Sequence, residues 1–460
     1  MLSRRRSRRL LAFVVSCAPT LSAAAAPKPP AARTVELTLT AAPARLELIP
    51  GHPTDVFAYN GQVPGPTFEF REGDHVVIHF HNNLPEATTI HWHGLHIPAA
   101  SDGSPLTPIP PGGSYDYVFD LLPGSAGTYW YHPHPDKRTG YQIAKGLYGA
   151  LIVRAADDPL EGIREQLLVL SDNRFRTDGE LDFPSPESPQ ASIDEENGRE
   201  GDVLFVSGRI MPTVSIRSGE VQRWRIVNAS AARVYRLALD GHELLQVGTD
   251  GGLFERPVPV NEIVLANSER AEILVRATGA PGTRALLRAL PYDRYAPQTR
   301  PANWSVPRDL LTLQYSDEAP VAPVALPSRL REVPALDTAK ATVRRVIVFS
   351  QGMINSRKMD MRRVDERARL GATEIWQIEN VVGMDHPFHL HGFQFQVLDR
   401  NGVPEPFRAW SDGINVPKHG RVRIIVRFDD YPGKWMYHCH ILDHEDEGMM
   451  GILAVTPTGR

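Results

Sequence analysis

Three stretches of the chain share a strand pattern in which apolar and polar side chains alternate. Residues 76–80, 221–227 and 374–378 read Val-Val-Ile-His-Phe, Val-Gln-Arg-Trp-Arg-Ile-Val and Glu-Ile-Trp-Gln-Ile. A period of two with β-branched and aromatic residues predicts half-buried strands. Each strand lies between a glycine and an asparagine nine positions further on: Gly73 and Asn82, Gly219 and Asn228, Gly371 and Asn380. The pattern indicates three copies of one unit.

The copies start about 150 residues apart, which is the size of one β-sandwich domain with its loops. We predict an all-β fold with three consecutive sandwiches, at 33–155, 159–316 and 335–460. The 36 glycines and 40 prolines suit many short strands joined by turns. We expect an acidic, proline-containing stretch at 183–202 to be a surface loop and a proline-rich segment at 319–327 to be a stiff linker.

The first 26 residues predict an export signal, with arginines at 4–6 and 8–9, an apolar run at 10–15 and alanines at 23–26. Ser7-Arg8-Arg9-Leu10-Leu11 resembles a twin-arginine signal, so we expect a periplasmic or otherwise exported protein. Val14-Val15-Ser16-Cys17 also resembles a lipoprotein cleavage box, and only lipidation of Cys17 would give membrane contact. The net charge of -4 gives no reason to expect a nucleic-acid partner. We expect a monomer.

Of the two cysteines, one lies in the predicted signal, so Cys439 is the one thiol of the mature chain. An internal disulfide is then excluded, and metal ligation is the leading use of this thiol. Cys439 lies between His438 and His440, and His444 and Met449 follow. A thiolate, imidazoles and a distant thioether form the ligand set of a blue-copper centre, which needs a second imidazole from elsewhere. In a strand, the two flanking histidines point away from the cysteine and can hold a different metal behind it.

His-x-His pairs occur twice in the first unit and twice in the third. His91-Trp92-His93 and His389-Leu390-His391 each begin nine positions after the marker asparagine, where the second unit has Leu237 and Leu239. His132-Pro133-His134 and His438-Cys439-His440 follow later in the same two units. If these units face each other, eight imidazoles meet, which is too many for one ion and suits a cluster of about three.

With these motifs the chain resembles the multicopper oxidases of the three-domain laccase type, over nearly all of its mature length. The motifs are His91-Trp92-His93-Gly94, His132-Pro133-His134, His386-Pro387-Phe388-His389-Leu390-His391, and His438-Cys439-His440 with His444 and Met449. The sequences of these motifs most resemble those of the bacterial exported branch, which contains laccase-like enzymes and periplasmic copper oxidases. The resemblance implies three cupredoxin-like Greek-key β-sandwich domains and four copper ions.

The resemblance also implies the ligands of each ion. The type 1 copper takes His386, Cys439, His444 and, axially, Met449. The type 2 copper takes His91 and His389, and the type 3 pair takes His93, His132, His134, His391, His438 and His440. Two carboxylates, Asp102 and Glu445, stand where this family places proton donors. The alternatives are a turn aspartate at 102 and, at 445, a hydrogen-bond partner of a ligand histidine.

The activity implied by the resemblance is that of a laccase-like oxidoreductase. Single electrons from a reducing substrate enter at the type 1 copper, and four of them reduce dioxygen to water at the cluster. Cuprous-oxidase relatives carry a methionine-rich insertion, whereas only Met353, Met359 and Met361 lie near that region here. We therefore expect a phenol or aromatic amine that contacts the imidazole edge of a copper ligand. An aromatic loop at 291–304 is a candidate rim for that substrate or an ordinary connection.

Other classes stay open at this point. The first alternative is an oxidase of Cu(I) or another metal ion in copper tolerance. A copper nitrite reductase usually joins two such domains and lacks the paired His-x-His clusters. A non-catalytic copper carrier would bind without turnover. An exported relative of the same fold has lost its ligands and serves in cell division, and the intact ligand motifs argue against that class.

Overall fold

A computed structural model describes residues 33–457 of the chain. The predicted export signal at 1–26, with Cys17, lies outside the described residues. Six β-sheets account for nearly all regular structure between them, which confirms the predicted all-β class. Within residues 33–457, no helix is long and apolar enough to cross a membrane.

The first sandwich packs a four-stranded sheet, in the order β2-β1-β4-β6, against a second one in the order β3-β8-β7-β5. Both sheets mix parallel and antiparallel pairs, because β1 runs parallel to β4 and β3 parallel to β8. The strands are β1 (Thr34–Ile49), β2 (His52–Tyr59), β3 (Phe68–Arg71), β4 (His75–Asn82), β5 (His91–His93), β6 (Ser114–Asp120), β7 (Gly127–His132) and β8 (Gly149–Arg154).

The second sandwich has sheets in the orders β10-β9-β12-β17-β14-β15 and β11-β19-β18-β13-β16. Its strands are β9 (Arg164–Asn173), β10 (Val203–Val206), β11 (Thr213–Ile216), β12 (Val221–Asn228), β13 (Tyr235–Leu239), β14 (Leu244–Thr249), β15 (Gly252–Val260), β16 (Ile263–Leu265), β17 (Arg270–Arg276), β18 (Arg284–Leu290) and β19 (Arg308–Tyr315).

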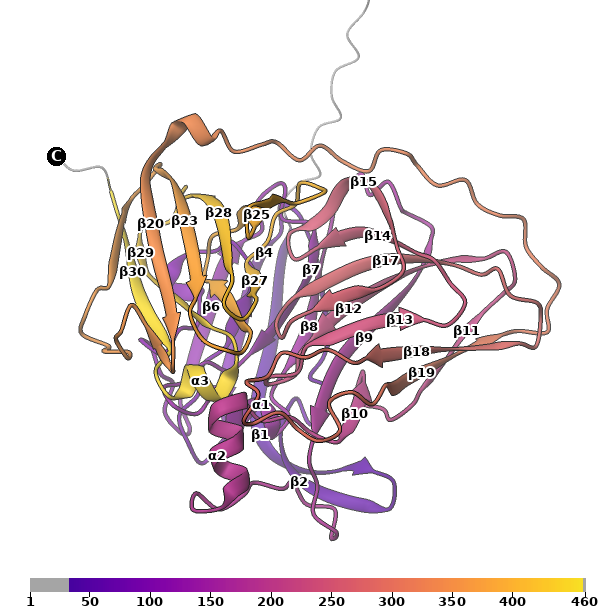
Figure 1. Cartoon of the computed structure of the whole chain (residues 1–460), viewed down its shortest axis with the longest axis horizontal. Helices are drawn as coiled ribbons and strands as arrows, with labels where there is room; N and C mark the ends of the chain where they lie inside the picture. The colour runs from indigo at the N-terminus through magenta and orange to yellow at the C-terminus, as the bar shows by residue number, and fades with distance from the viewer. Residues whose placement is uncertain (1–32, 458–460) are drawn as a thin grey trace, which may run out of the picture. The chain divides into compact units, whose positions relative to one another are not determined.

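The third sandwich has sheets in the orders β21-β20-β23-β28-β25-β26 and β22-β30-β29-β24-β27. Figure 1 shows β20, β23 and β28 side by side, in orange to yellow. The strands are β20 (Ala341–Ser350), β21 (Met353–Ile354), β22 (Glu366–Arg369), β23 (Thr373–Asn380), β24 (His386–Leu390), β25 (Phe395–Arg400), β26 (Val403–Pro404), β27 (Gly413–Val416), β28 (Arg421–Arg427), β29 (Gly433–Cys439) and β30 (Met450–Thr456).

Helices are short in all three sandwiches. The α-helices are α1 (Thr139–Ala144), α2 (Pro189–Asn197) and α3 (Leu442–Asp446), and the 3-10 turns are η1 (Ala99–Ser101) and η2 (Thr338–Lys340). Helix α2 corrects the expectation of a surface loop at 183–202. It forms because the Ser188 side chain accepts a hydrogen bond from the Ala191 backbone N–H and Pro189 occupies the first turn.

The sequence repeat is also a structural repeat. The marker strands β4, β12 and β23 each pair in parallel with the first long strand of their own sandwich. Each marker asparagine donates its side-chain amide to carbonyls of the following loops and accepts a backbone N–H two residues ahead. The asparagine thus fixes the turn that leads from one sheet to the other, which explains its place in the repeat.

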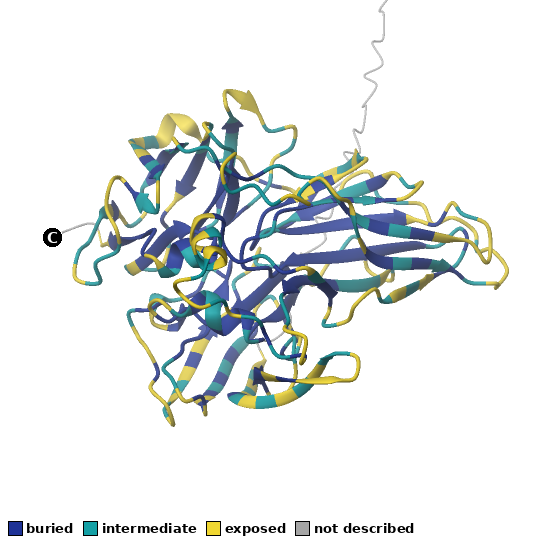
Figure 2. Ribbon diagram, turned by 60° about the horizontal axis from the view of Figure 1, so that its bottom comes forward, coloured by how far each residue is buried: buried dark blue, intermediate teal, exposed yellow. Residues whose placement is uncertain are grey.

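Among the marker strands, β12 differs most from the half-buried expectation. All eight residues of β12 are buried, including Arg223 and Arg225 on its polar face. Their guanidinium groups form ion pairs with Glu272 of the neighbouring strand β17, so a face that reads as solvated lies against other parts of the chain. Figure 2 shows both kinds of strand, some alternating in colour and others dark blue along their length.

Candidate metal centre

Two pairs of antiparallel strands position the His-x-His motifs. In the first sandwich β5 pairs with β7, which sets His91 opposite His132. In the third sandwich β24 pairs with β29, which sets His389 opposite His438. Because alternate residues of a strand share a face, the second histidine of each motif points the same way as the first. The first and the third sandwich therefore each present four imidazoles on one side.

The imidazoles of the two sandwiches meet. His91 Nε2 lies 3.4 Å from His389 Nε2, and His134 Nε2 lies 3.4 Å from His438 Nε2. The eight rings that converge are those of His91, His93, His132, His134, His389, His391, His438 and His440, all buried. The structure thus brings together every histidine that the resemblance places at the type 2 and type 3 ions.

The chemistry of these rings suits metal ions. Burial, followed by the neighbouring imidazoles, lowers the pKa of His389 and His391 well below the ordinary value, and burial lowers the pKa of His438 to about 3. These three rings are therefore neutral, as ligands must be. Neither ring nitrogen of His440 has a hydrogen-bond partner, although buried polar atoms rarely stay unpaired. Neutral, converging and partly unpartnered imidazoles fit copper.

A second group of ligand atoms lies on the other side of β29. Cys439 Sγ is 3.7 Å from His444 Nδ1, and the ring centroids of His386 and His444 are 5.1 Å apart. These three side chains are close enough to share one ion. Met449 is fully buried in the same hydrophobic cluster as Cys439. Burial raises the pKa of the Cys439 thiol, so a bound cation is needed to hold it as the thiolate.

Asp102 lies at the histidine cluster. Its carboxylate accepts a hydrogen bond from His391 Nδ1 at 2.8 Å, and its backbone carbonyl accepts one from His91 Nδ1 at 2.9 Å. A single residue after η1 therefore orients one ring from each sandwich. Gly103 makes this placement possible, because it has a positive φ and a Cβ there would overlap the carbonyl group of Ile90.

Glu445 is also buried among the cluster histidines. Its two oxygens lie 3.3 Å from His134 Nδ1 and 3.3 Å from His438 Nδ1, and neither has a hydrogen-bond partner of good geometry. Burial raises the pKa of Glu445 well above its usual value, which favours the protonated form of this carboxyl group. Although Glu445 follows His444 in sequence, it faces different histidines.

Helix α2 covers the thiolate site, contrary to the expectation of an accessible imidazole edge. His444 is only 5% exposed, and its Nε2–H donates to the backbone carbonyl of Glu196 at 2.9 Å. The 291–304 loop packs next to this helix, where Arg294 donates to the carbonyl of Asn197 at 2.6 Å. The same loop reaches the residue before His386, since Tyr292 donates to Asp385 at 2.7 Å. The cover comes from the middle of the chain, so local patterns near His444 cannot reveal it.

Sequence reasoning also misses Asp412 and Arg270. Asp412 lies beside His93, with 3.0 Å between Asp412 Oδ1 and His93 Nε2, and it forms a buried ion pair with Arg270 of β17. The available signal is that β17, which reads Arg-Ala-Glu-Ile-Leu-Val-Arg, carries charges at positions where a core strand is apolar.

Comparisons with known proteins agree with this geometry. Three family models, each described as multicopper oxidase, match residues 41–158, 170–303 and 330–459. The multicopper oxidase mco of Staphylococcus aureus is 31% identical over 91% of this chain and 88% of its own length. A laccase of Bacillus subtilis is 31% identical over 88% of this chain and 91% of its own length. The cell division protein FtsP of Xenorhabdus nematophila is 31% identical over 88% of this chain and 86% of its own.

Among solved structures, a multicopper oxidase from Campylobacter jejuni, described as a metallo-oxidase, is similar to this chain. It has a TM-score of 0.83 and 34% identity, with 92% of both chains covered. The chain belongs to the multicopper oxidase family, whose members are copper-containing oxidoreductases that use dioxygen. The predicted family, enzyme class and cupredoxin-like fold are thereby confirmed.

Proposed function

We propose that the protein is a laccase-like oxidase that couples one-electron oxidation of a reducing substrate to the four-electron reduction of dioxygen to water. The observation that carries this proposal is the convergence of eight buried imidazoles directly behind a buried Cys-His-His group. In this assignment His386, Cys439, His444 and Met449 hold the type 1 copper, and the eight cluster histidines hold one type 2 and two type 3 ions. Bound copper supplies reversible one-electron chemistry at the thiolate and dioxygen reduction at the cluster.

The chain contributes a short connection between the two sites. Cys439 points into the hydrophobic core of the third sandwich, whereas its neighbours His438 and His440 point into the histidine cluster. Only one peptide bond on each side separates the thiolate from these imidazoles, which is the shortest link that a strand can provide. Because all three residues are buried, water is kept from this path.

Glu445 and Asp102 supply the proton chemistry in this proposal. Reduction of dioxygen to water consumes protons, and Glu445, whose pKa burial raises, lies 3.3 Å from each of two cluster imidazoles. Asp102 accepts from His391 Nδ1, which leaves Nε2 of that ring free for a ligand bond. Glu445 is thus the proposed proton donor. Asp102 orients His391 by accepting its hydrogen bond and lies close enough to the histidine cluster to pass protons to it.

The substrate of the proposed enzyme is a phenol or aromatic amine, with Cu(I) or another metal ion as the second candidate. Two observations support the metal ion as the second candidate. Helix α2 blocks direct contact with His444, and the same helix places the exposed carboxylates Glu195 and Glu196 at the cover, where they attract small cations. The metallo-oxidase from Campylobacter jejuni is a relative with that description.

One purification tests the function. The copper-loaded protein should be blue, contain four copper ions per chain, and consume oxygen with a reductant. Rates with a phenol, an aromatic amine, Cu(I), Fe(II) and Mn(II) rank the substrates. A blue protein that consumes no oxygen with any of them is a carrier, and a colourless protein that binds no copper has a structural role; either result overturns the proposal.

Export and domain limits complete the proposal. Residues 1–26 direct the protein to the periplasm as a twin-arginine substrate, and the domains span 33–155, 159–316 and 335–460. The mass of the protein isolated from the periplasm tests the first point, because cleavage after the alanine run and lipidation at Cys17 give different masses. Failure to find the protein outside the cytoplasm contradicts it.

A further inference from the structure

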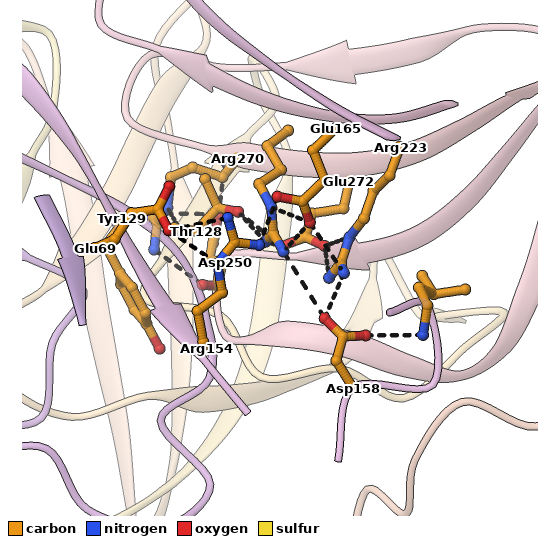
Figure 3. Close-up of polar contacts among 12 residues, drawn as sticks. Glu69, Thr128, Tyr129, Arg154, Asp158, Glu165, Arg223, Asp250, Arg270 and Glu272 are labelled. Carbon is orange, nitrogen blue, oxygen red and sulfur yellow. Dashed lines mark hydrogen bonds and ion pairs between the residues drawn. The ribbon is translucent and has the colours of Figure 1, made fainter. Parts of the chain in front are cut away.

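Arg270 contacts all three sandwiches at the edge of the histidine cluster. It lies on β17 of the second sandwich and is completely buried. Its Nε–H donates to the carbonyl of Thr128 in the first sandwich at 3.1 Å. Its Nη1–H donates to Asp412 Oδ1 of the third sandwich at 2.8 Å, and its Nη2–H donates to Asp412 Oδ2. Figure 3 shows Arg270 near Thr128 and near Asp250, whose Oδ1 lies 3.5 Å from Arg270 Nη1.

Asp412 in turn contacts two cluster histidines. His93 Nε2 lies 3.0 Å from the Asp412 carboxylate, and His389 Nδ1 lies 2.8 Å from the Asp412 carbonyl oxygen. The His93 and His389 rings stack with their centroids 3.8 Å apart. Each ring therefore has one nitrogen directed at Asp412 and the other free to face the cluster. His93 Nδ1 lies 3.4 Å from His132 Nε2, and His389 Nε2 lies 3.4 Å from His91 Nε2.

The contacts fix which nitrogen of each ring carries the proton. A carboxylate and a carbonyl can only accept, so His93 carries its proton on Nε2 and His389 carries its proton on Nδ1. The remaining nitrogens, His93 Nδ1 and His389 Nε2, are then unprotonated and available as ligands. Asp412 could itself be a ligand with these two rings. However, both of its oxygens already accept from the Arg270 guanidinium, which makes it a hydrogen-bond acceptor here.

The backbone leaves room for this arrangement. Gly94, directly after His93, has a positive φ, and a Cβ on it would overlap both Asp412 Oδ2 and Arg270 Nη2. A glycine is therefore required for the ion pair to approach the strand that carries His91 and His93.

We propose that Arg270 and Asp412 are positioning residues that set the orientation and tautomer of His93 and His389. Through Arg270, the middle sandwich, which provides no copper ligand of its own, then affects how tightly the histidine cluster retains its metal ions. The inference rests on the proposed copper cluster. Removing a hydrogen-bond partner behind a metal ligand typically weakens metal binding about 10- to 100-fold. Among residues 33–457, no hydrogen bond or ion pair joins this pair to the Cys439 site, so we expect that site to be unaffected.

The test compares Arg270→Lys and Asp412→Asn with a matched control, Arg345→Lys. Arg345 makes a similar two-bond ion pair with buried Glu374, at 2.6 and 2.9 Å, within the third sandwich. Each copper-loaded, full-length variant is titrated with a copper chelator. Retained copper, the blue absorption and the type 2 electron paramagnetic resonance splitting are then measured.

We expect Arg270→Lys and Asp412→Asn, the two cluster variants, to release copper from the histidine cluster at a chelator concentration about 10- to 100-fold lower than the wild type does. Their type 2 splitting should be altered, and their blue absorption per protein should be unchanged. The control should match the wild type in all three measurements. Equal retention in cluster variants and control overturns the inference. So does parallel loss of the blue site and of the near-ultraviolet circular dichroism signal, which would mean a general packing role. If the wild type itself binds no cluster copper, the proposed function has failed, which is a distinguishable result.

Discussion

The substitution Glu272→Gln measures how much a buried ion-pair cluster of the second sandwich stabilises the protein. Glu272 is fully buried and accepts hydrogen bonds from Arg223 Nε at 2.8 Å, from Arg225 Nη1 at 2.6 Å, and from Thr128 Oγ1 at 2.7 Å. Figure 3 shows this cluster, in which the threonine comes from the first sandwich. Burial raises the pKa of Glu272, but Arg223 and Arg225 outweigh that effect and lower the pKa from 4.5 to about 2.

The lowered pKa of Glu272 gives the size of its contribution to the free energy of unfolding. A carboxyl group whose pKa is lowered by folding stabilises the protein above its unfolded pKa, and this stabilisation is lost as the pH falls toward the folded pKa. At about 1.4 kcal/mol per pH unit, the interval from 4.5 to about 2 corresponds to about 3 kcal/mol at pH 7. Glutamine keeps the shape without the charge, so the variant should lose about 3 kcal/mol at pH 7. The difference in free energy of unfolding between the wild type and the variant should be smaller by about 1 kcal/mol at pH 4 than at pH 7.

Urea unfolding of the metal-free protein at both pH values, followed by tryptophan fluorescence, measures these free energies. Glu69→Gln is the control, because Glu69 pairs with Arg154 at 3.3 Å while its side chain is 57% exposed, and exposed pairs contribute about 0–1 kcal/mol. A loss at Glu272 no larger than at Glu69, or a difference that widens at low pH, would refute the reasoning.

Three further substitutions address the metal sites. Met449→Leu should raise the potential of the blue site, because a thioether stabilises oxidised copper relative to an alkyl side chain; a redox titration that finds an unchanged or lower potential contradicts the assignment. Cys439→Ser should abolish the blue absorption but keep copper at the histidine cluster, whereas a persistent blue colour by absorption spectroscopy would show that another residue binds that ion. Glu445→Gln should lower the rate of oxygen consumption about 100-fold with the blue absorption intact, and an unchanged rate removes Glu445 as proton donor.

The sequence predicts the fold well because its signals are local and repeated. The marker glycines all have positive φ angles, and the marker asparagines all bridge the same turn. Such positions are constrained by backbone conformation, so they are visible without knowledge of tertiary contacts. The histidine motifs are visible for a similar reason, since strand alternation directs both members of a His-x-His pair to one face.

The remaining site residues depend on contacts that are distant in sequence. Arg270 and Asp412 are 142 positions apart, and Glu196 and His444 are 248 apart. Neither pair has a spacing that a strand or helix period would single out. The expectation of a half-buried strand at 221–227 was wrong for the same reason, because Arg223 and Arg225 find their partners only when the sheets assemble.

These distant contacts explain why a sandwich without any ligand motif belongs to this enzyme. The segment at 159–316 supplies Arg270 behind the histidine cluster and the Glu196 carbonyl over His444. The Glu196 carbonyl contacts the far nitrogen of His444 directly, and Arg270 acts on the far nitrogen of His93 through Asp412. Such a contact orients a ring whose near nitrogen faces a proposed copper ion and tunes its basicity. Because a ligand that binds only the assembled chain stabilises the assembly, copper binding and docking of the middle sandwich favour each other. The middle sandwich therefore sets the geometry of ligands that its two neighbours provide.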